Sequence, residues 1–137
     1  AEIILFMFAG ALLKRFSLWG LLCTTLVFST IRWWMIAYLV DFSHFLLIAQ
    51  ILHAASFGLA HVVAIQLLYE YFGHHHQSQG QALYSAMSFG VGGMLGSLGS
   101  GYFWDKLGGD VVFLLAMLAS GIALLIAATF IPRRWPI

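Results

Sequence analysis

The chain has 137 residues, of which 62% are hydrophobic and 8% are charged, and its formal net charge is +1. A soluble domain usually has about 25% charged residues, so this composition excludes that class and indicates an integral membrane protein. The small net charge gives no reason to expect nucleic acid as a partner, and the single cysteine excludes an internal disulfide.

Five apolar segments predict an all-α helical bundle within the membrane, because the apolar runs are continuous and do not alternate. We expect one domain over residues 1–137, with helices at about 2–14, 17–40, 44–71, 79–104 and 110–131. A spanning helix needs about 20 residues, so the first segment is a truncated helix and the other four are full transmembrane helices. More protein is therefore expected before Ala1.

Basic residues set the expected orientation. If the helices alternate in direction, four of the six Lys and Arg residues lie on one side: Lys14, Arg15, Arg133 and Arg134. The positive-inside rule makes that side cytoplasmic. We therefore predict a multi-pass protein of the cell membrane, in bacteria the inner membrane, with Lys14–Arg15, a polar loop at 73–80 and the C-terminus in the cytoplasm.

The third segment carries polar residues on one face. Gln50, His53, Phe57 and His61 are three or four residues apart, so a helix places them together. Polar groups in lipid are costly and are usually kept for function or for helix packing. Gln81 and Tyr84 enter the fourth segment at helical spacing, where lining a cavity and interhelical hydrogen bonding are equal alternatives. The candidate substrate-binding residues are Gln50, Phe57, His61, Gln81 and Tyr84.

Arg32 and His53 form the candidate proton-coupling pair. At about 1.5 Å per residue, Arg32 lies roughly 9 Å and His53 roughly 12 Å below the outer boundary of a core about 30 Å thick. They lie on consecutive antiparallel helices, and a neighbouring cation favours neutral imidazole, so an arriving proton competes with Arg32. In the alternative interpretation, Arg32 reaches outward to the interface and His53 bonds a backbone carbonyl.

Glu2 is the one carboxylate that we place within the membrane, roughly 16 Å from the cytoplasmic side. It is a third proton-coupling candidate, able to neutralise Arg32, bind a proton or contact substrate. Alternatively, Glu2 only looks buried because the chain begins there.

The fourth segment contains two series of small residues four positions apart. Such series let helices pack closely. We assign helix packing to Gly92, Gly93, Gly96, Ser97 and Gly101, with a bending helix as the weaker alternative. His74, His75 and His76 cannot all face one ion on a regular helix, so no metal site is predicted.

With these residues in hand, the chain resembles the C-terminal part of a major facilitator superfamily transporter. It is most similar to the group with phenylpropionate permease, nucleoside:proton symporters and lactose permease. The stretches that carry the resemblance are 2–16, 29–33, 50–61, 80–85 and 96–108. The resemblance implies transmembrane helices 8 to 12 of a twelve-helix fold, with substrate bound between two halves.

In lactose permease-like symporters, an Arg and a His at the positions of Arg32 and His53 belong to the proton-coupling network. That network has a carboxylate one turn after the His, where this chain has Ser56. Another carboxylate, such as Glu2 or one in the missing part, would have to replace it.

The expected function is therefore proton-coupled secondary transport of a small organic solute, such as an aromatic acid or a nucleoside, by alternating access. The expected partners are the substrate, the lipid bilayer and a missing N-terminal half. Protons are the coupling ion, and no other cofactor and no enzyme activity are expected. The alternative is a membrane scaffold or sensor that does not transport.

Overall fold

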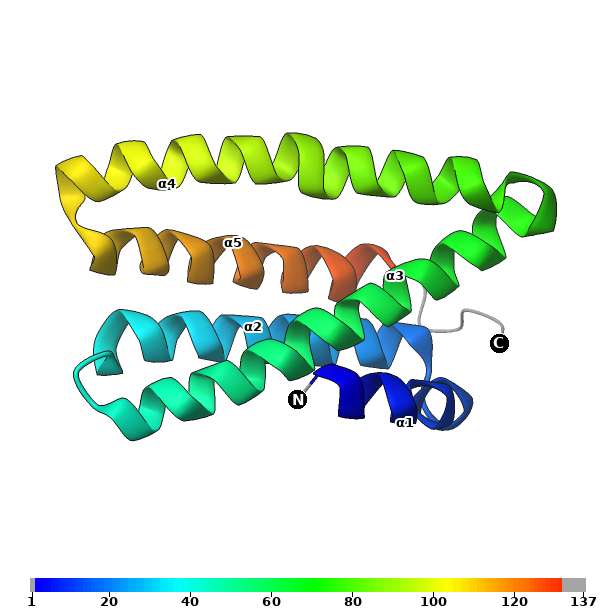
Figure 1. The fold of residues 1–137 in the computed structure, drawn as a ribbon, viewed down its shortest axis with the longest axis horizontal. Coiled ribbons are helices and arrows are strands. Elements are labelled where there is room, and N and C mark those ends of the chain that lie inside the picture. Colours follow the sequence, from blue (N-terminus) through cyan, green and yellow to red (C-terminus); the bar gives the residue numbers. More distant parts are fainter. Residues whose placement is uncertain (1, 132–137) are drawn as a thin grey trace.

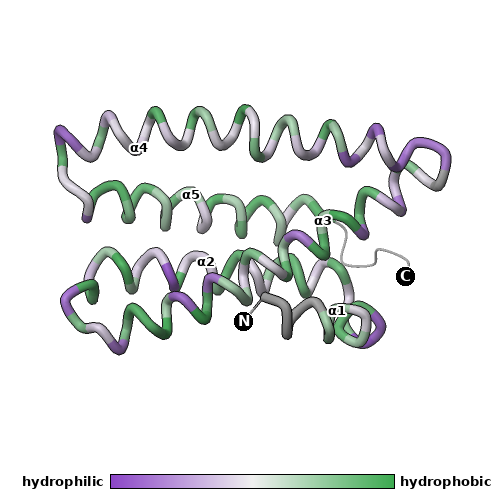
Figure 2. The backbone as a smooth tube through the Cα atoms, in the orientation of Figure 1, coloured by the Kyte–Doolittle hydropathy of each residue, from purple (hydrophilic) through white to green (hydrophobic). Residues whose placement is uncertain are grey.

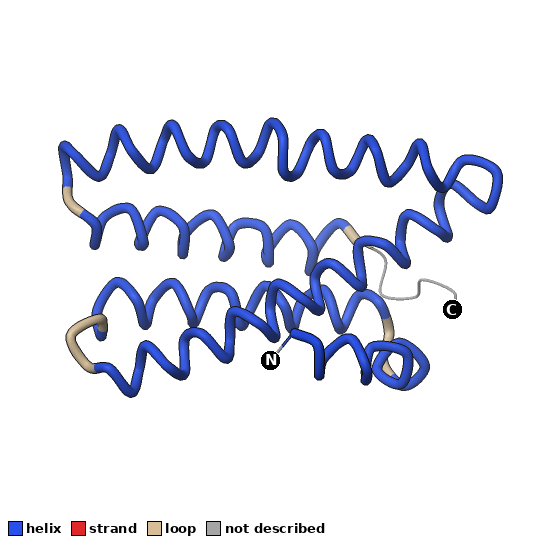
Figure 3. Tube along the Cα trace, in the orientation of Figure 1, coloured by secondary structure: helices blue, strands red, loops and turns tan. Residues whose placement is uncertain are grey.

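The computed structural model describes the backbone of residues 2–131, and their side chains except those of residues 2–6 and His74. These residues form α1 (Glu2–Arg15), α2 (Leu18–Leu39), α3 (Ser43–Ser85), the π-helix η1 (Ala86–Gly92), α4 (Gly93–Leu107) and α5 (Gly109–Phe130). Figure 1 shows them as an elongated bundle of roughly parallel and antiparallel rods, and Figure 3 shows how short the connections are. Within the described residues there is no strand, so the predicted all-α class is confirmed.

Three helical stretches are long and apolar enough to cross a membrane: Leu18–Leu39, Ser43–Gly73 and Gly109–Phe130. The fourth predicted span is helical throughout, but η1 divides it, and α4 alone has 15 residues, fewer than a crossing needs. Figure 2 shows hydrophilic positions at the helix ends and at a few places within α2 and α3. These interior positions form the candidate site described below.

Helix α2 is the centre of the bundle and packs most extensively against α3 and α5. Against α5, the indole Nε1 of Trp19 donates a hydrogen bond to the backbone oxygen of Ala127 at 3.1 Å. About three turns of α2 beyond it, the hydroxyls of Ser29 and Ser120 lie 3.3 Å apart. These two polar contacts fix the rotation of α2 relative to α5.

The contact between α2 and α3 is apolar near the N-terminal end of α2. The buried side chains there are Leu18, Leu21, Leu59 and Val63. Ser17 begins α2 as an N-cap, because its hydroxyl accepts a hydrogen bond from the backbone N–H of Gly20 at 3.1 Å. The cap and the apolar cluster together set where α2 starts and which of its faces meets α3.

The predicted polar loop at 73–80 is wrong. The backbone leaves the helical conformation only at Gly73, with φ 64° and ψ 179°, and is helical again over the following residues up to Ser85. Gly80 is buried there, and a Cβ on it would lie 2.7 Å from the ring of Phe72. The polar His, Gln and Ser residues of this stretch are compatible with a solvated helix, so polarity alone did not indicate a loop.

Gly73→Ala is expected to destabilise the full-length protein by about 1–3 kcal/mol, because essentially only glycine adopts its φ and ψ. The measurement is the unfolding free energy in mixed detergent micelles. The matched control is Gly121→Ala, where a Cβ meets no atom within 4 Å and alanine favours the helix. Equal stability of the two variants would contradict this role for Gly73.

Candidate functional site

Arg32 and His53 meet between α2 and α3. The guanidinium Nη1 of Arg32 lies 2.7 Å from the imidazole Nδ1 of His53, and both side chains are half-buried. The sequence placed the two residues at a similar depth on adjacent antiparallel helices. The structure adds that the helices are rotated so that the two side chains point at each other.

The direction of this hydrogen bond fixes the state of the imidazole. A guanidinium has only donors, so Nδ1 must accept, and the ring is neutral with its proton on Nε2. Protonating Nδ1 would turn the acceptor into a donor and place two cations beside each other. Two like charges about 4 Å apart repel by about 4 kcal/mol at an effective dielectric of 20. The Arg32–His53 contact and a doubly protonated His53 therefore exclude one another.

Aromatic side chains hold the guanidinium from its other side. Its central carbon lies 3.9 Å from the centroid of the Trp33 ring, a cation–π contact. Trp33 in turn stacks on Phe113 of α5, with ring centroids 5.8 Å apart. The Arg32 Nε is buried and has no hydrogen-bond partner among the described residues. The guanidinium is thus positioned by three helices, yet one of its strong donors is unsatisfied.

A cavity of about 170 Å³ adjoins this pair, and Ser29, Ser56 and Phe57 are among the residues that line it. No carboxylate lines the cavity in the described part of the chain. Ser56 occupies the position at which lactose permease-like symporters have a carboxylate. Its side chain is buried, and its hydroxyl donates a hydrogen bond to the backbone oxygen of His53 at 3.2 Å. Ser56 therefore stabilises the local turn of α3 and supplies no charge to Arg32.

A row of aromatic rings leads away from His53. The His53 and Phe57 centroids are 5.6 Å apart, and Phe57 lies 6.5 Å from Phe89 of η1. Phe89 is 5.9 Å from Tyr84, whose ring is 6.1 Å from that of His61 on α3. Three of the five predicted substrate-binding residues, Phe57, His61 and Tyr84, thus lie in one continuous row that is formed by residues of α3 together with Phe89 of η1.

The other predicted site residues lie apart from this row. Gln50 is exposed near the start of α3, and Gln81 is half-buried three residues before Tyr84. The backbone of Glu2 begins α1, but its side chain lies outside the described part of the chain, so its predicted coupling role stays a prediction.

Comparison with known proteins identifies the family. The MFS_1 like family model matches residues 1–115. The chain belongs to this family. It is also 26% identical over 119 residues to a protein of Escherichia coli (strain K12) described as a probable 3-phenylpropionic acid transporter. That match covers 87% of this chain and 31% of the relative, so the chain spans about a third of the length of that protein. No solved structure matches the chain.

Membership of the MFS_1 like family confirms the predicted resemblance to the major facilitator superfamily. In this MFS chain, a permanently charged side chain on one candidate spanning helix, Arg32, contacts a titratable side chain on the next, His53.

Sequence reasoning missed Glu70, a second carboxylate within the predicted spans of this MFS chain. It is half-buried near the end of the Ser43–Gly73 span, where its Oε1 accepts a hydrogen bond from Gln66 Nε2 at 3.1 Å. Its Oε2 is buried without a hydrogen-bond partner in the described part of the chain. Glu70 and Lys14 line one cavity of about 280 Å³. The four-residue spacing of Gln66 and Glu70, which makes them neighbours on a helix, was the sequence feature that could have identified Glu70.

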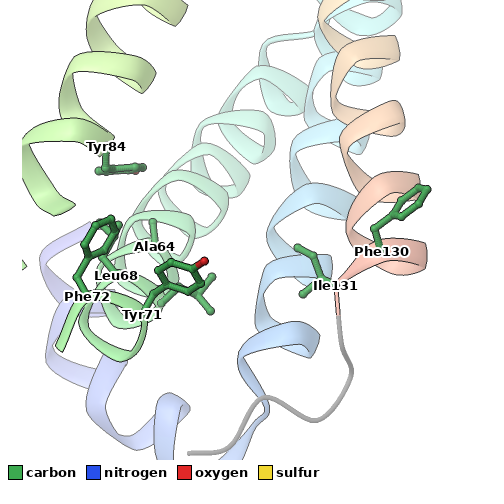
Figure 4. Close-up of a pocket in the computed structure, with 8 residues that line it drawn as sticks. Ala64, Leu68, Tyr71, Phe72, Tyr84, Phe130 and Ile131 are labelled. Carbon is green, nitrogen blue, oxygen red and sulfur yellow. The ribbon is translucent and has the colours of Figure 1, made fainter.

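A more spacious cavity, of about 560 Å³, lies elsewhere, near the Gly73 break (Figure 4). Tyr71, Phe72 and Tyr84 face it from α3, and Phe130 and Ile131 border it at the end of α5. Its lining is almost entirely apolar, and among the described residues no charged group lines it. The chemistry of proton or anion binding therefore points to the smaller cavity at Arg32.

The small residues of the fourth segment face open space in this chain. A Cβ would meet no atom within 4 Å at Gly90, Gly93, Gly96, Gly99 and Gly101. At Gly92 it would lie 3.3 Å from the backbone oxygen of Met87, within the same helical stretch, and Ser97 is exposed. The predicted helix-packing role therefore stays a prediction.

Proposed function

We propose that this chain is part of a proton-coupled secondary transporter in which Arg32 and His53 form the proton-responsive pair. The observation that carries the proposal is the 2.7 Å contact between Arg32 Nη1 and His53 Nδ1 on two adjacent spanning helices. Because a proton on Nδ1 abolishes this hydrogen bond, proton arrival changes how α2 and α3 are held together. A change of this kind is what alternating access needs.

The substrate in this proposal is a small organic solute, with an aromatic acid or a nucleoside as the leading classes. The relative's description names 3-phenylpropionic acid, and the aromatic row from His53 to His61 suits a ring-bearing substrate. Protons are the coupling ion, and the proposal includes no other cofactor.

The opposing half of the transport cavity is proposed to come from residues beyond this chain, which spans about a third of its relative. Large apolar side chains of η1 and α4 are exposed, among them Phe89, Leu95 and Leu98. A second helical half and lipid would cover these side chains and the open glycine positions. The chain alone is therefore expected not to transport.

The test is uptake by the full-length protein in proteoliposomes. An inward proton gradient should drive accumulation of labelled 3-phenylpropionate or a nucleoside above the external concentration, and a protonophore should abolish it. Absence of gradient-driven accumulation of every candidate, alongside intact folding, would reject proton-coupled transport and favour a non-transporting membrane protein.

The proposed orientation places the Lys14–Arg15 turn and residues 73–80 in the cytoplasm. Figure 1 shows the turns near residues 41 and 108 at one end of the bundle and the Gly73 break at the opposite end. In a variant with Cys23 replaced by alanine, Ser78→Cys should react with a membrane-impermeant thiol reagent only from the cytoplasm. Asp41→Cys and Asp105→Cys should react only from outside. The opposite pattern would overturn the orientation.

A further inference from the structure

Arg32 is a cation without a compensating anion in the described part of the chain. One edge of its guanidinium is bonded to a neutral imidazole and one face lies on Trp33, while Nε–H has no acceptor among the described residues. A charge inside a membrane protein is costly unless it is paired or hydrated. The preferred partner of a guanidinium is a carboxylate, which accepts two parallel hydrogen bonds from one edge. No protein carboxylate lines the adjoining cavity in the described part of the chain.

We propose that the substrate supplies this anion: Arg32 binds the carboxylate of an apolar monocarboxylic acid in the state in which His53 is protonated. This inference rests on the proposed transport function, narrows its substrate to a monocarboxylate and adds the residue that recognises the substrate. The contact with His53 uses Nη1, so the edge formed by Nε and Nη2 remains available to a carboxylate. When that contact breaks, Nη1 becomes available as well.

Proton and carboxylate binding are then mutually dependent. A proton on His53 Nδ1 releases Arg32 but leaves two cations side by side. A carboxylate placed between the two cations neutralises one charge and removes the repulsion. By linkage, the anion strengthens proton binding by the same factor as the proton strengthens anion binding. One proton and one monocarboxylate therefore bind together, and their joint release restores the Arg32–His53 hydrogen bond.

The groups around the pair allow this assignment. Arg32 is the one titratable residue in the middle of α2 that faces His53, and the α5 sequence from 111 to 130 contains no titratable residue. Tyr84, which lies on α3 beyond the Gly73 break, contacts His61. The side chain of Glu2 on α1 is not described. Phe57 lines the same cavity as Arg32, which places an apolar surface beside the carboxylate position.

The experiment is equilibrium binding to the purified full-length protein in lipid nanodiscs. The probes are 3-phenylpropionate, its shorter and longer homologues phenylacetate and 4-phenylbutyrate, and the uncharged 3-phenylpropanamide. Between pH 8 and pH 6 the acids remain ionised. At least one acid should bind about tenfold or more tightly at pH 6 than at pH 8, with uptake of about one proton. The amide should bind at least tenfold more weakly than that acid at pH 6, without pH dependence.

Two variants assign the roles. Arg32→Gln should reduce acid binding to the level of the amide, and His53→Gln should keep the preference for the acid but lose both pH dependence and proton uptake. Arg32→Lys, which keeps the charge but loses the planar fork, should give intermediate acid binding if Arg32→Gln fails to fold. Matched control Lys106→Gln removes an exposed cation that contacts Tyr102 and should leave binding unchanged.

Several results would overturn the inference: equal binding of acid and amide, undiminished acid binding by folded Arg32→Gln, or no binding of any acid. These results are distinguishable from failure of the transport proposal. Proton-driven uptake of an uncharged solute with equal acid and amide binding rejects only the carboxylate site. Acid binding with proton uptake but without accumulation in proteoliposomes rejects only the transport function.

Discussion

His53→Ala in the full-length protein is expected to reduce accumulation driven by a pH gradient by about 5- to 150-fold, the range of typical coupling free energies. The imidazole is the only titratable group that contacts Arg32 among the described residues, and alanine can neither accept its hydrogen bond nor bind a proton. Exchange of labelled for unlabelled substrate should be affected less, because it needs no net proton transfer. The measurement compares both rates in the same proteoliposomes.

The control for this variant is His44→Ala. His44 is an exposed histidine at the start of the same helix, and its ring contacts Phe42 and Phe45. Its removal should leave accumulation unchanged. If His53→Ala accumulated substrate as well as the wild type, His53 would be a packing residue. The coupling group would then be Glu2, Glu70 or a residue outside this chain.

Replacing Arg32 and His53 together by apolar residues should separate function from stability. A buried charged group replaced by well-packed apolar side chains is often neutral or stabilising by about 1–4 kcal/mol. We therefore expect Arg32→Met with His53→Leu to unfold at the same temperature as the wild type or higher. The same variant should have lost uphill accumulation entirely. Thermal unfolding in detergent and proteoliposome uptake measure the two effects.

The single and double alanine variants of Arg32 and His53 form a double-mutant cycle. Arg32→Ala alone removes the donor to Nδ1 of the half-buried His53, a loss of about 1–3 kcal/mol in unfolding free energy. In accumulation, Arg32→Ala, His53→Ala and the double alanine variant should be similarly impaired, because the residues act through one hydrogen bond. Additive losses in accumulation would show that the two side chains act independently.

The sequence by itself determined the class of protein and much of the site. The low charge and continuous apolar runs require a helical membrane protein, since lipid supplies no partner for unpaired backbone groups. The rise per residue placed Arg32 and His53 at similar depth before any contact was known. Polarity was a weaker guide, because the residues after Gly73 are polar yet helical, and because Glu70 was overlooked at the end of a long apolar run.

The tertiary structure decided which atoms meet. Depth follows from counting residues, but the rotation of α2 about its axis follows from its packing against α3 and α5. That rotation brings Nη1 of Arg32 to Nδ1 of His53, lays the guanidinium on Trp33 and leaves Nε without a partner among the described residues. The aromatic row likewise depends on how η1 approaches α3. Spacing identified the small residues of the fourth segment but not their partner, because a stripe on one helix does not specify which surface packs against it.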